Sequence, residues 1–299
     1  MDKKTNFGPF PAREIACLIK RREKMDSQQR FIRGENGTMK SEIFRTISVT
    51  KKDAVLTIAF NRPERLNAFN PIMSSEFPDA IRSANRMTDV RVIVLTGEGR
   101  AFSAGGDMSE VKDTPESFAE ESVHARDIVF GLLDCEKPVI CRMNGDAIGL
   151  GATIALLCDV VIAVDSARIG DPHVRMGLVA GDGGALIWPM LVGPMAAKYY
   201  LLTGDLIAAP DAQTLGLITR SVPADNLDAE VAKLADKLAA GAPLAIRWTK
   251  RAINSQLQAL GKLQFDLSLA YEGITVLSED HAEAKAAFLA KRKPSFKGK

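Results

Sequence analysis

Apolar and polar positions alternate over the first strongly patterned part of the chain, which starts near residue 42. The runs at 42–50 and 54–60 both alternate, and Asn61 to Pro63 ends the second run. Alternation with a period of two is typical of half-buried strands, and proline punctuates them. The sequence therefore predicts a β-hairpin in this region.

Beyond the hairpin, short apolar runs alternate with segments whose apolar residues recur every three or four positions. The short runs predict buried strands at 90–96, 138–143 and 159–164, and the periodic segments predict helices at 72–87, 115–133 and 148–157. A repeated β-α-β order indicates parallel strands joined by crossover helices. The fold class expected is therefore α/β.

The last quarter of the chain has a different pattern. After one more strand near 216–222, helical spacing predicts helices at 227–240, 243–254, 260–277 and 280–291. A helical tail with no sheet to cover is expected to pack on a neighbouring chain, so we expect an oligomer. The chain divides into a mobile N-terminal extension at 1–38, a core carrying the active site at 39–224, and a helical oligomerisation region at 225–299.

Charge is concentrated at the two ends of the chain. The 299 residues have a net charge of +2, but residues 1–38 carry +4 and residues 291–299 carry +5, which leaves −7 on the body. Duplex-binding proteins spread Lys and Arg over a folded face, so this balance argues against a nucleic-acid partner. The basic ends are either solvated tails or, at the C-terminus, a contact for an anionic ligand such as phosphate.

The amino-acid composition argues against several other classes of protein. The longest apolar runs are far shorter than the ~20 residues that cross a bilayer, so no membrane partner is expected. Four cysteines without a CxxC pair indicate reduced thiols and a cytoplasmic protein. Three histidines and no HExxH motif give no expectation of a metal site.

Three glycine-rich segments follow strands, at 97–107, 144–151 and 181–184. None fits G-x-G-x-x-G, GxxxxGK[ST] or GxSxG, so dinucleotide binding, phosphate-loop chemistry and serine-triad hydrolysis are not indicated. Each segment is either a tight turn or exposed backbone whose unpaired N–H groups form an oxyanion hole, as at the N-terminus of a helix.

Five strings together carry a resemblance over residues 41–299. They are FNRPERLNAFN (60–70), LTGEGRAFSAGGDM (95–108), NGDAIGLGATIALLCD (144–159), LLTGD (201–205) and SEDHAEAKAAFLAKRKPSF (278–296). In this order they resemble the crotonase superfamily, which includes enoyl-CoA hydratases and isomerases. The resemblance implies a crotonase-like spiral of ββα units with a C-terminal helical trimerisation region, assembled as a homotrimer or a dimer of trimers. It also implies fatty acid metabolism on an acyl-CoA thioester or a related carbonyl substrate, with CoA as part of the substrate and no separate cofactor.

The same resemblance assigns roles to individual positions. The oxyanion hole falls on the backbone N–H groups of Ala104 and Leu150. The substrate-binding positions fall on Arg62, Arg65, Ala68, Gly105, Asp107 and Gly151. Two fixed amides would stabilise the enolate or tetrahedral oxyanion that forms at the thioester carbonyl.

This chain departs from the family at its two catalytic glutamates, which fall on Thr153 and His173. A threonine hydroxyl has no useful pKa near 7, but an imidazole does, so His173 is the candidate acid/base. Asp182 is its candidate partner, although an aspartate there could instead cap the following helix. Asp171 is a second possible partner, but side chains so close along an extended turn usually diverge.

Three functions remain open from the sequence. The first is an enoyl-CoA hydratase or isomerase in which His173 moves a proton at an enolate. The second is a hydrolase of a β-dicarbonyl C–C bond, because the spacing of His173 and Asp182 resembles the β-diketone hydrolase branch of the superfamily. The third is a non-catalytic RNA-binding protein on the same fold.

Overall fold

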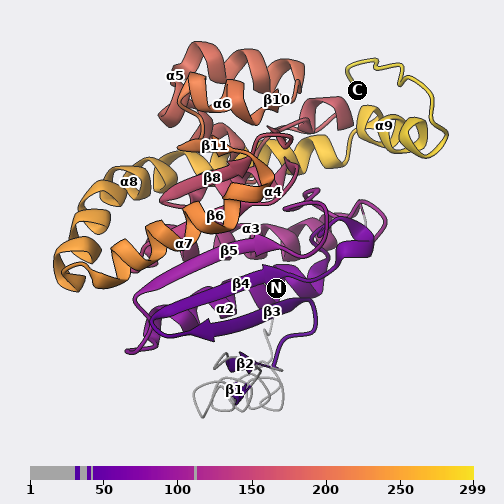
Figure 1. Cartoon of the computed structure of the whole chain (residues 1–299). Helices are drawn as coiled ribbons and strands as arrows, with labels where there is room; N and C mark the ends of the chain where they lie inside the picture. The colour runs from indigo at the N-terminus through magenta and orange to yellow at the C-terminus, as the bar shows by residue number, and fades with distance from the viewer. Residues whose placement is uncertain (1–30, 34–38, 42, 111–112) are drawn as a thin grey trace, which may run out of the picture.

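One large twisted sheet organises the molecule. The computed structural model describes residues 31–33, 39–41, 43–110 and 113–299 (Figure 1); most of the expected extension at 1–38 lies outside these residues. The strands are β1 (Phe31–Arg33), β2 (Met39–Ser41), β3 (Ile47–Lys52), β4 (Val55–Phe60), β5 (Val92–Gly97), β6 (Val139–Met143), β8 (Val160–Val164) and β11 (Arg220–Val222), in the spatial order β1-β2-β3-β4-β5-β6-β8-β11.

The sheet changes direction at β4. Strands β1 to β4 pair antiparallel, whereas β4, β5, β6, β8 and β11 all pair parallel. The predicted hairpin and the predicted parallel crossovers are both confirmed. A second sheet, which the sequence did not indicate, joins β7 (Ala147–Ile148), β9 (Arg168–Gly170) and β10 (Ile207–Ala208).

Helices cover the sheet and continue beyond it (Figure 1). They are α2 (Pro71–Arg86), α3 (Pro115–Asp134), α4 (Leu150–Leu157), α5 (Gly184–Thr203), α6 (Ala209–Leu215), α7 (Ala224–Ala240), α8 (Pro243–Val276) and α9 (Glu279–Leu289), with short 3₁₀ turns η2 (Pro63–Arg65) and η3 (His173–Met176). Local chemistry sets the starts of α2 and α3: Asn70 and Thr114 accept hydrogen bonds from the third helical amide, and proline occupies the first turn.

Helix α8 corrects one expectation. The sequence indicated two helices, at 243–254 and 260–277, whereas the structure has one continuous helix. The helix continues through residues 255–259, where a gap was expected. Gly261, close to the start of the second predicted segment, is buried, and a Cβ there would meet the Phe130 ring at 3.3 Å. This glycine lets α8 approach α3 closely.

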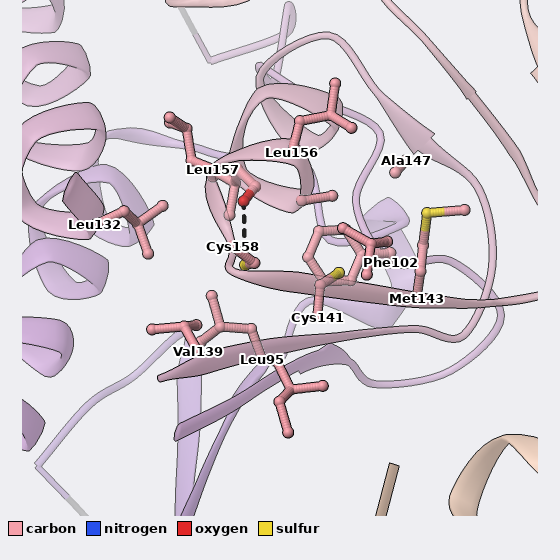
Figure 2. Packing of buried hydrophobic residues seen from close by; sticks show 14 of the residues in the cluster. Leu95, Phe102, Leu132, Val139, Cys141, Met143, Ala147, Leu156, Leu157 and Cys158 are labelled. Carbon is pink, nitrogen blue, oxygen red and sulfur yellow. Dashed lines mark hydrogen bonds between the residues drawn. The ribbon is translucent and has the colours of Figure 1, made fainter. Parts of the chain in front are cut away.

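The core lies where α4 rests on the strands. Figure 2 shows Leu156 and Leu157 of α4, Leu95 of β5 and Cys141 of β6 as members of one buried cluster, with α4 above the strands. The cysteines in the described part of the chain, Cys135, Cys141 and Cys158, are buried and unpaired. Packing of this density fixes α4 and therefore the position of its N-terminus.

Helix α5 is long and apolar enough to span a membrane by length and composition, but only 22% of its apolar window is buried in the molecule. Gly193 breaks the helix with φ of 75° and ψ of 161°, which divides it into segments 184–192 and 194–203. Each segment is much shorter than the ~20 residues that a bilayer requires. An uninterrupted spanning helix is therefore absent from the described residues.

Candidate active site

Two glycine-rich loops meet through their backbones at the carboxyl ends of β5 and β6. The Ile148 amide donates to Ser103 O at 2.9 Å, and the Phe69 amide donates to Gly105 O at 2.7 Å. Gly105 has φ of +87°, and a Cβ there would meet Ile148 O at 2.7 Å. Only glycine permits this approach and this conformation without strain.

The backbone donors at this junction differ from the expected pair. Leu150 is the first residue of α4, so its amide has no acceptor within the helix. The Ala104 amide donates to Leu66 O at 2.9 Å and is therefore occupied. The Gly106 amide has no acceptor in the described part of the chain, and Gly106 is exposed. Gly106 and Leu150 thus each offer a backbone amide that has no acceptor among the described residues.

A cavity of about 210 Å³ opens beside these amides. The loop at 104–106 and Leu150 line one part of it, and His173, Asp182 and Glu272 line another. Its apolar wall includes Phe69, Pro71, Met108, Phe118, Ile128 and Leu178. One cavity therefore holds backbone donors, ionisable groups and space for an apolar chain.

The ionisable groups are arranged around His173, which begins η3. The Nδ1–H of His173 donates to Asp171 Oδ1, while Nε2 lies 3.5 Å from Asp182 Oδ2 and 3.9 Å from Glu272 Oε1. Thr153 Oγ1 donates to Asp182 Oδ1 at 3.3 Å. Thr153 and His173, the two positions at which the resemblance placed glutamates, therefore both contact the carboxyl group of Asp182.

Asp171 overturns one expectation from the sequence. The 3₁₀ turn of η3 folds the chain back, so the side chains of Asp171 and His173 converge instead of diverging. Asp171 is completely buried and fixes the orientation of the ring. Asp182 lies at the other ring nitrogen and directly precedes Gly183, the N-cap residue of α5.

The glycines around Asp182 make room for this cluster. A Cβ on Gly181 would meet Glu272 Oε2 at 2.6 Å, one on Gly183 would meet Thr153 Cγ2 at 2.6 Å, and one on Gly184 would collide with Asp171 Oδ2. The GDGG segment therefore serves close packing of side chains from three other elements. It supplies Asp182 and leaves space for its neighbours.

Burial and mutual charge shift the pKa values of these groups. Burial raises the pKa of Asp182 to about 6 and that of Glu272 to about 8, although the charge of His173 opposes both shifts. Burial lowers the pKa of His173, but Asp171, Asp182 and Glu272 outweigh it and hold that pKa well above its usual value. Because the groups interact strongly, they titrate as one unit. These shifts favour the ionised form of Asp182 over that of Glu272 and favour the protonated form of His173.

One ligand atom each from Asp171, His173 and Asp182 lies within 4.8 Å of the others, a spacing that a metal ion could use. In this arrangement, however, Asp171 already accepts from the imidazole and Asp182 accepts from Thr153. The three side chains that could bind a metal ion are therefore already hydrogen-bonded within the protein.

The expected substrate-binding residues divide into two groups. Arg62 is buried, and its guanidinium donates to Ala68 O at 2.5 Å, Asp107 Oδ2 at 3.0 Å and Glu110 Oε1 at 2.7 Å. Burial raises the pKa of Asp107, but hydrogen bonds from Ser109 and Arg62 leave it lowered. These contacts show that Arg62 stabilises the loop that contains Asp107 and Glu110.

The remaining positions lie closer to the surface or the cavity. Arg65 is exposed, and its guanidinium has no partner among the described residues. Gly105 lines the cavity. Gly151 packs against Ser103, because a Cβ on it would meet Ser103 O at 2.6 Å. Arg65 and Gly105 are thus the members of the expected set that remain open to a ligand.

Sequence reasoning missed Gly106, Asp171 as a partner, and Glu272. Glu272 lies 99 positions beyond His173, in a segment interpreted as an oligomerisation region. A signal was nevertheless present: with Phe265 and Leu269, Glu272 follows the buried face of α8 at helical spacing. A lone carboxyl group on an apolar stripe is unusual and indicates a specific role.

Comparison with known proteins identifies the family. The model of the enoyl-CoA hydratase/isomerase family matches residues 50–299. The chain belongs to the enoyl-CoA hydratase/isomerase family. Within it, the chain is 34% identical over 259 residues to a crotonyl-CoA hydratase of Syntrophomonas wolfei, covering 85% of this chain and 98% of the relative. It is 36% identical over 250 residues to the 1,2-epoxyphenylacetyl-CoA isomerase of Escherichia coli, covering 82% and 95%.

Solved structures agree with this assignment. A crystal structure of an enoyl-CoA hydratase/isomerase from Mycobacterium paratuberculosis has a TM-score of 0.78 and 34% identity, covering 82% of this chain and 99% of that one. The crotonase-like fold is therefore confirmed, and the protein is an acyl-CoA enzyme of the hydratase/isomerase type. These relatives give no support to a β-dicarbonyl hydrolase or to an RNA-binding protein.

Proposed function

We propose that this hydratase/isomerase-family enzyme holds a thioester enolate with the amides of Gly106 and Leu150, while His173 and Asp182 move a proton at the acyl chain. The observation that supports the proposal is that all four residues line one cavity of about 210 Å³. It brings together two free backbone amides and a buried imidazole–carboxylate pair. Gly106 replaces Ala104 as the first donor because the Ala104 amide is already bonded to Leu66.

The electrostatics favour this chemistry. The enolate oxygen would lie at the N-terminus of α4, where the helix dipole and the unpaired Leu150 amide favour negative charge. A fixed donor that strengthens in the transition state contributes a rate factor of about 10²–10³. Asp182, whose pKa is about 6, is a competent base at neutral pH, and protonated His173 is a competent acid.

CoA enters only as part of the substrate in this proposal, and turnover needs no resident cofactor, metal or nucleic acid. The exposed Arg65 is the best placed of the expected residues to meet the nucleotide phosphates of CoA, whereas Arg62 and Asp107 support the loop. Buried, unpaired thiols agree with a cytoplasmic location. Activity that survives exhaustive dialysis against a chelator would support the metal-free assignment.

The test compares wild type with His173→Gln on trans-2-enoyl-CoA and 3-enoyl-CoA thioesters, following the enoyl absorbance, with CoA binding measured by calorimetry. We expect wild type to turn over a thioester, and His173→Gln to lose about 10²–10⁴-fold in kcat while still binding CoA. Glu279→Gln, an exposed position on α9 outside the cavity, is the control and should keep wild-type kcat. Wild-type kcat in His173→Gln would exclude the assigned role.

A further inference from the structure

Glu272 is a buried carboxyl group whose presence is not explained by the hydrogen bonding or packing of the fold. It comes from α8, its side chain is 12% exposed, and it lines the cavity beside His173. Its Oε2 atom is fully buried and has no hydrogen-bond partner in the described residues. A buried polar atom without a partner destabilises the folded state, and an apolar side chain would fill this position on α8 without that cost.

The surrounding chain also accommodates this carboxyl group. Gly181 leaves the space that Glu272 Oε2 occupies, and Ser268, one turn earlier on α8, donates to Gly181 O at 3.1 Å. The loop that supplies Asp182 is thereby attached to the helix that supplies Glu272. Asp182 and Glu272 are held at a fixed separation, with His173 Nε2 facing both, at 3.5 and 3.9 Å.

We propose that Glu272 is a second catalytic residue, which donates a proton to the α-carbon when water adds across an enoyl thioester, and that His173 relays protons between Glu272 and Asp182. This inference rests on the proposed function and specifies its reaction as hydration. Positions 153 and 173 carry no carboxyl group in this chain. Asp182 from the GDGG loop and Glu272 from α8 would supply the two carboxyl groups instead.

The proton balance closes over one turnover. Asp182 accepts a proton from water as the water oxygen bonds to the β-carbon, and the displaced electron pair moves to the thioester oxygen beside Gly106 and Leu150. The enolate then collapses as Glu272 delivers its proton to the α-carbon, which gives the 3-hydroxyacyl thioester. Asp182 is left protonated and Glu272 ionised. His173 gives its Nε2 proton to Glu272 and takes the proton from Asp182, which restores the starting state.

The protonation states agree with these roles. The groups facing Glu272 are His173 and Asp171 around η3, Asp182 before α5, and Glu121 on α3. Burial and the neighbouring carboxylates raise the pKa of Glu272 to about 8, whereas that of Asp182 is about 6. Two carboxyl groups whose environments separate their pKa values in this way are suited to act as acid and base. Between pH 6 and 8 the base is ionised and the acid is protonated.

The experiment measures hydration of crotonyl-CoA, trans-2-decenoyl-CoA and cinnamoyl-CoA by wild type, Glu272→Gln and Glu279→Gln from pH 5 to pH 9.5. Glu279 is an exposed glutamate on α9 and makes a matched control. We expect Glu272→Gln to lose about 10²–10⁴-fold in kcat with an unchanged Kd for CoA. We also expect the wild-type kcat to fall above about pH 8, and the residual rate of Glu272→Gln to lack this alkaline decline.

Several results would overturn the inference. Wild-type kcat in Glu272→Gln is one, and a wild type that isomerises 3-enoyl thioesters but hydrates none of the probes is another; both leave the proposed function standing. If Glu272→Gln does not fold, a wild-type kcat that stays flat to pH 9.5 decides against Glu272. By contrast, a wild type that neither binds CoA nor turns over any thioester removes the proposed function itself.

Discussion

At the scale of single residues, the most unusual feature is one imidazole surrounded by three carboxyl groups. Breaking a buried pair by removing one partner costs about 3–5 kcal/mol, yet replacing all the partners with apolar groups is often neutral or stabilising. Such a cluster is therefore a poor device for stability. Its position in the cavity, next to free amides, instead supports the proton-transfer role proposed for it.

The assignment of the Gly106 amide can be tested with two substitutions at that one position. Gly106→Pro removes the N–H group, so we expect kcat to fall by about 10²–10³-fold, the usual effect of losing one oxyanion donor. Gly106→Ala keeps the donor, and its Cβ meets nothing within 4 Å, so near-normal kcat is expected. Steady-state kinetics on a thioester substrate provides the measurement.

A thermal unfolding scan shows whether each Gly106 variant keeps its fold. Equal activity in the folded proline and alanine variants would contradict the role of this amide. The Ala104 amide would then need reconsideration, despite its hydrogen bond to Leu66.

The location of His173 in the cavity was predictable from the sequence, because the resemblance places this residue at a catalytic position. Its partners were less predictable, because their placement depends on backbone geometry. The turn of η3 brings Asp171 to Nδ1, and the packing of α8 brings Glu272 toward Nε2. The occupied state of the Ala104 amide was unpredictable for a similar reason: its hydrogen bond to Leu66, 38 positions earlier, has no local sequence signal.

At the scale of elements, the GDGG loop couples α5 to α8. Gly181→Ala would push a methyl group against Glu272 Oε2 and Ser268 O, at 2.6 and 2.5 Å. Overpacking of this kind costs about 1–3 kcal/mol of unfolding free energy. A 1 Å displacement of a catalytic group lowers kcat by on the order of 100-fold. We expect both losses, measured by urea unfolding and by hydration kinetics.

Gly131→Ala is the matched control for this loop. Gly131 lies inside α3, where an added Cβ meets nothing within 4 Å. Replacing a helix-interior glycine with alanine stabilises by about 0.5–1 kcal/mol, so this variant should unfold at higher urea with normal kcat. If Gly181→Ala behaves as Gly131→Ala does, the loop is not closely packed against α8.

The sequence predicted the elements of the core well, because hydrophobic periodicity and caps are local signals. Strands β3 to β6 and helices α2 and α3 lie close to their expected ranges. The predicted gap at residues 255–259 of α8 was wrong, because mostly polar residues there weaken the hydrophobic periodicity without ending the helix. The two-residue strands β7 and β10 have no periodicity that could reveal them.

At the scale of the whole molecule, α5 and α8 leave many large apolar side chains uncovered. Met195 is 85% exposed, Leu263 79% and Leu202 72%. Exposed apolar surface of this extent marks an interaction site. Figure 1 shows α5 and much of α8 extending away from the main sheet, so the sheet cannot cover these side chains. We propose that copies of this chain cover them in a homotrimer or a dimer of trimers.

Light scattering after size exclusion tests this assembly. We expect a mass of three or six chains of 32.3 kDa. Met195→Glu and Leu263→Glu, one on each helix, should each lower the mass, because burying an unpaired charge in an apolar interface is costly. Lys52→Glu, an exposed change on β3 away from both helices, should leave it unchanged. A wild type that remains monomeric at micromolar concentration would contradict the assembly without affecting the site, whose described ionisable groups and amides all come from one chain.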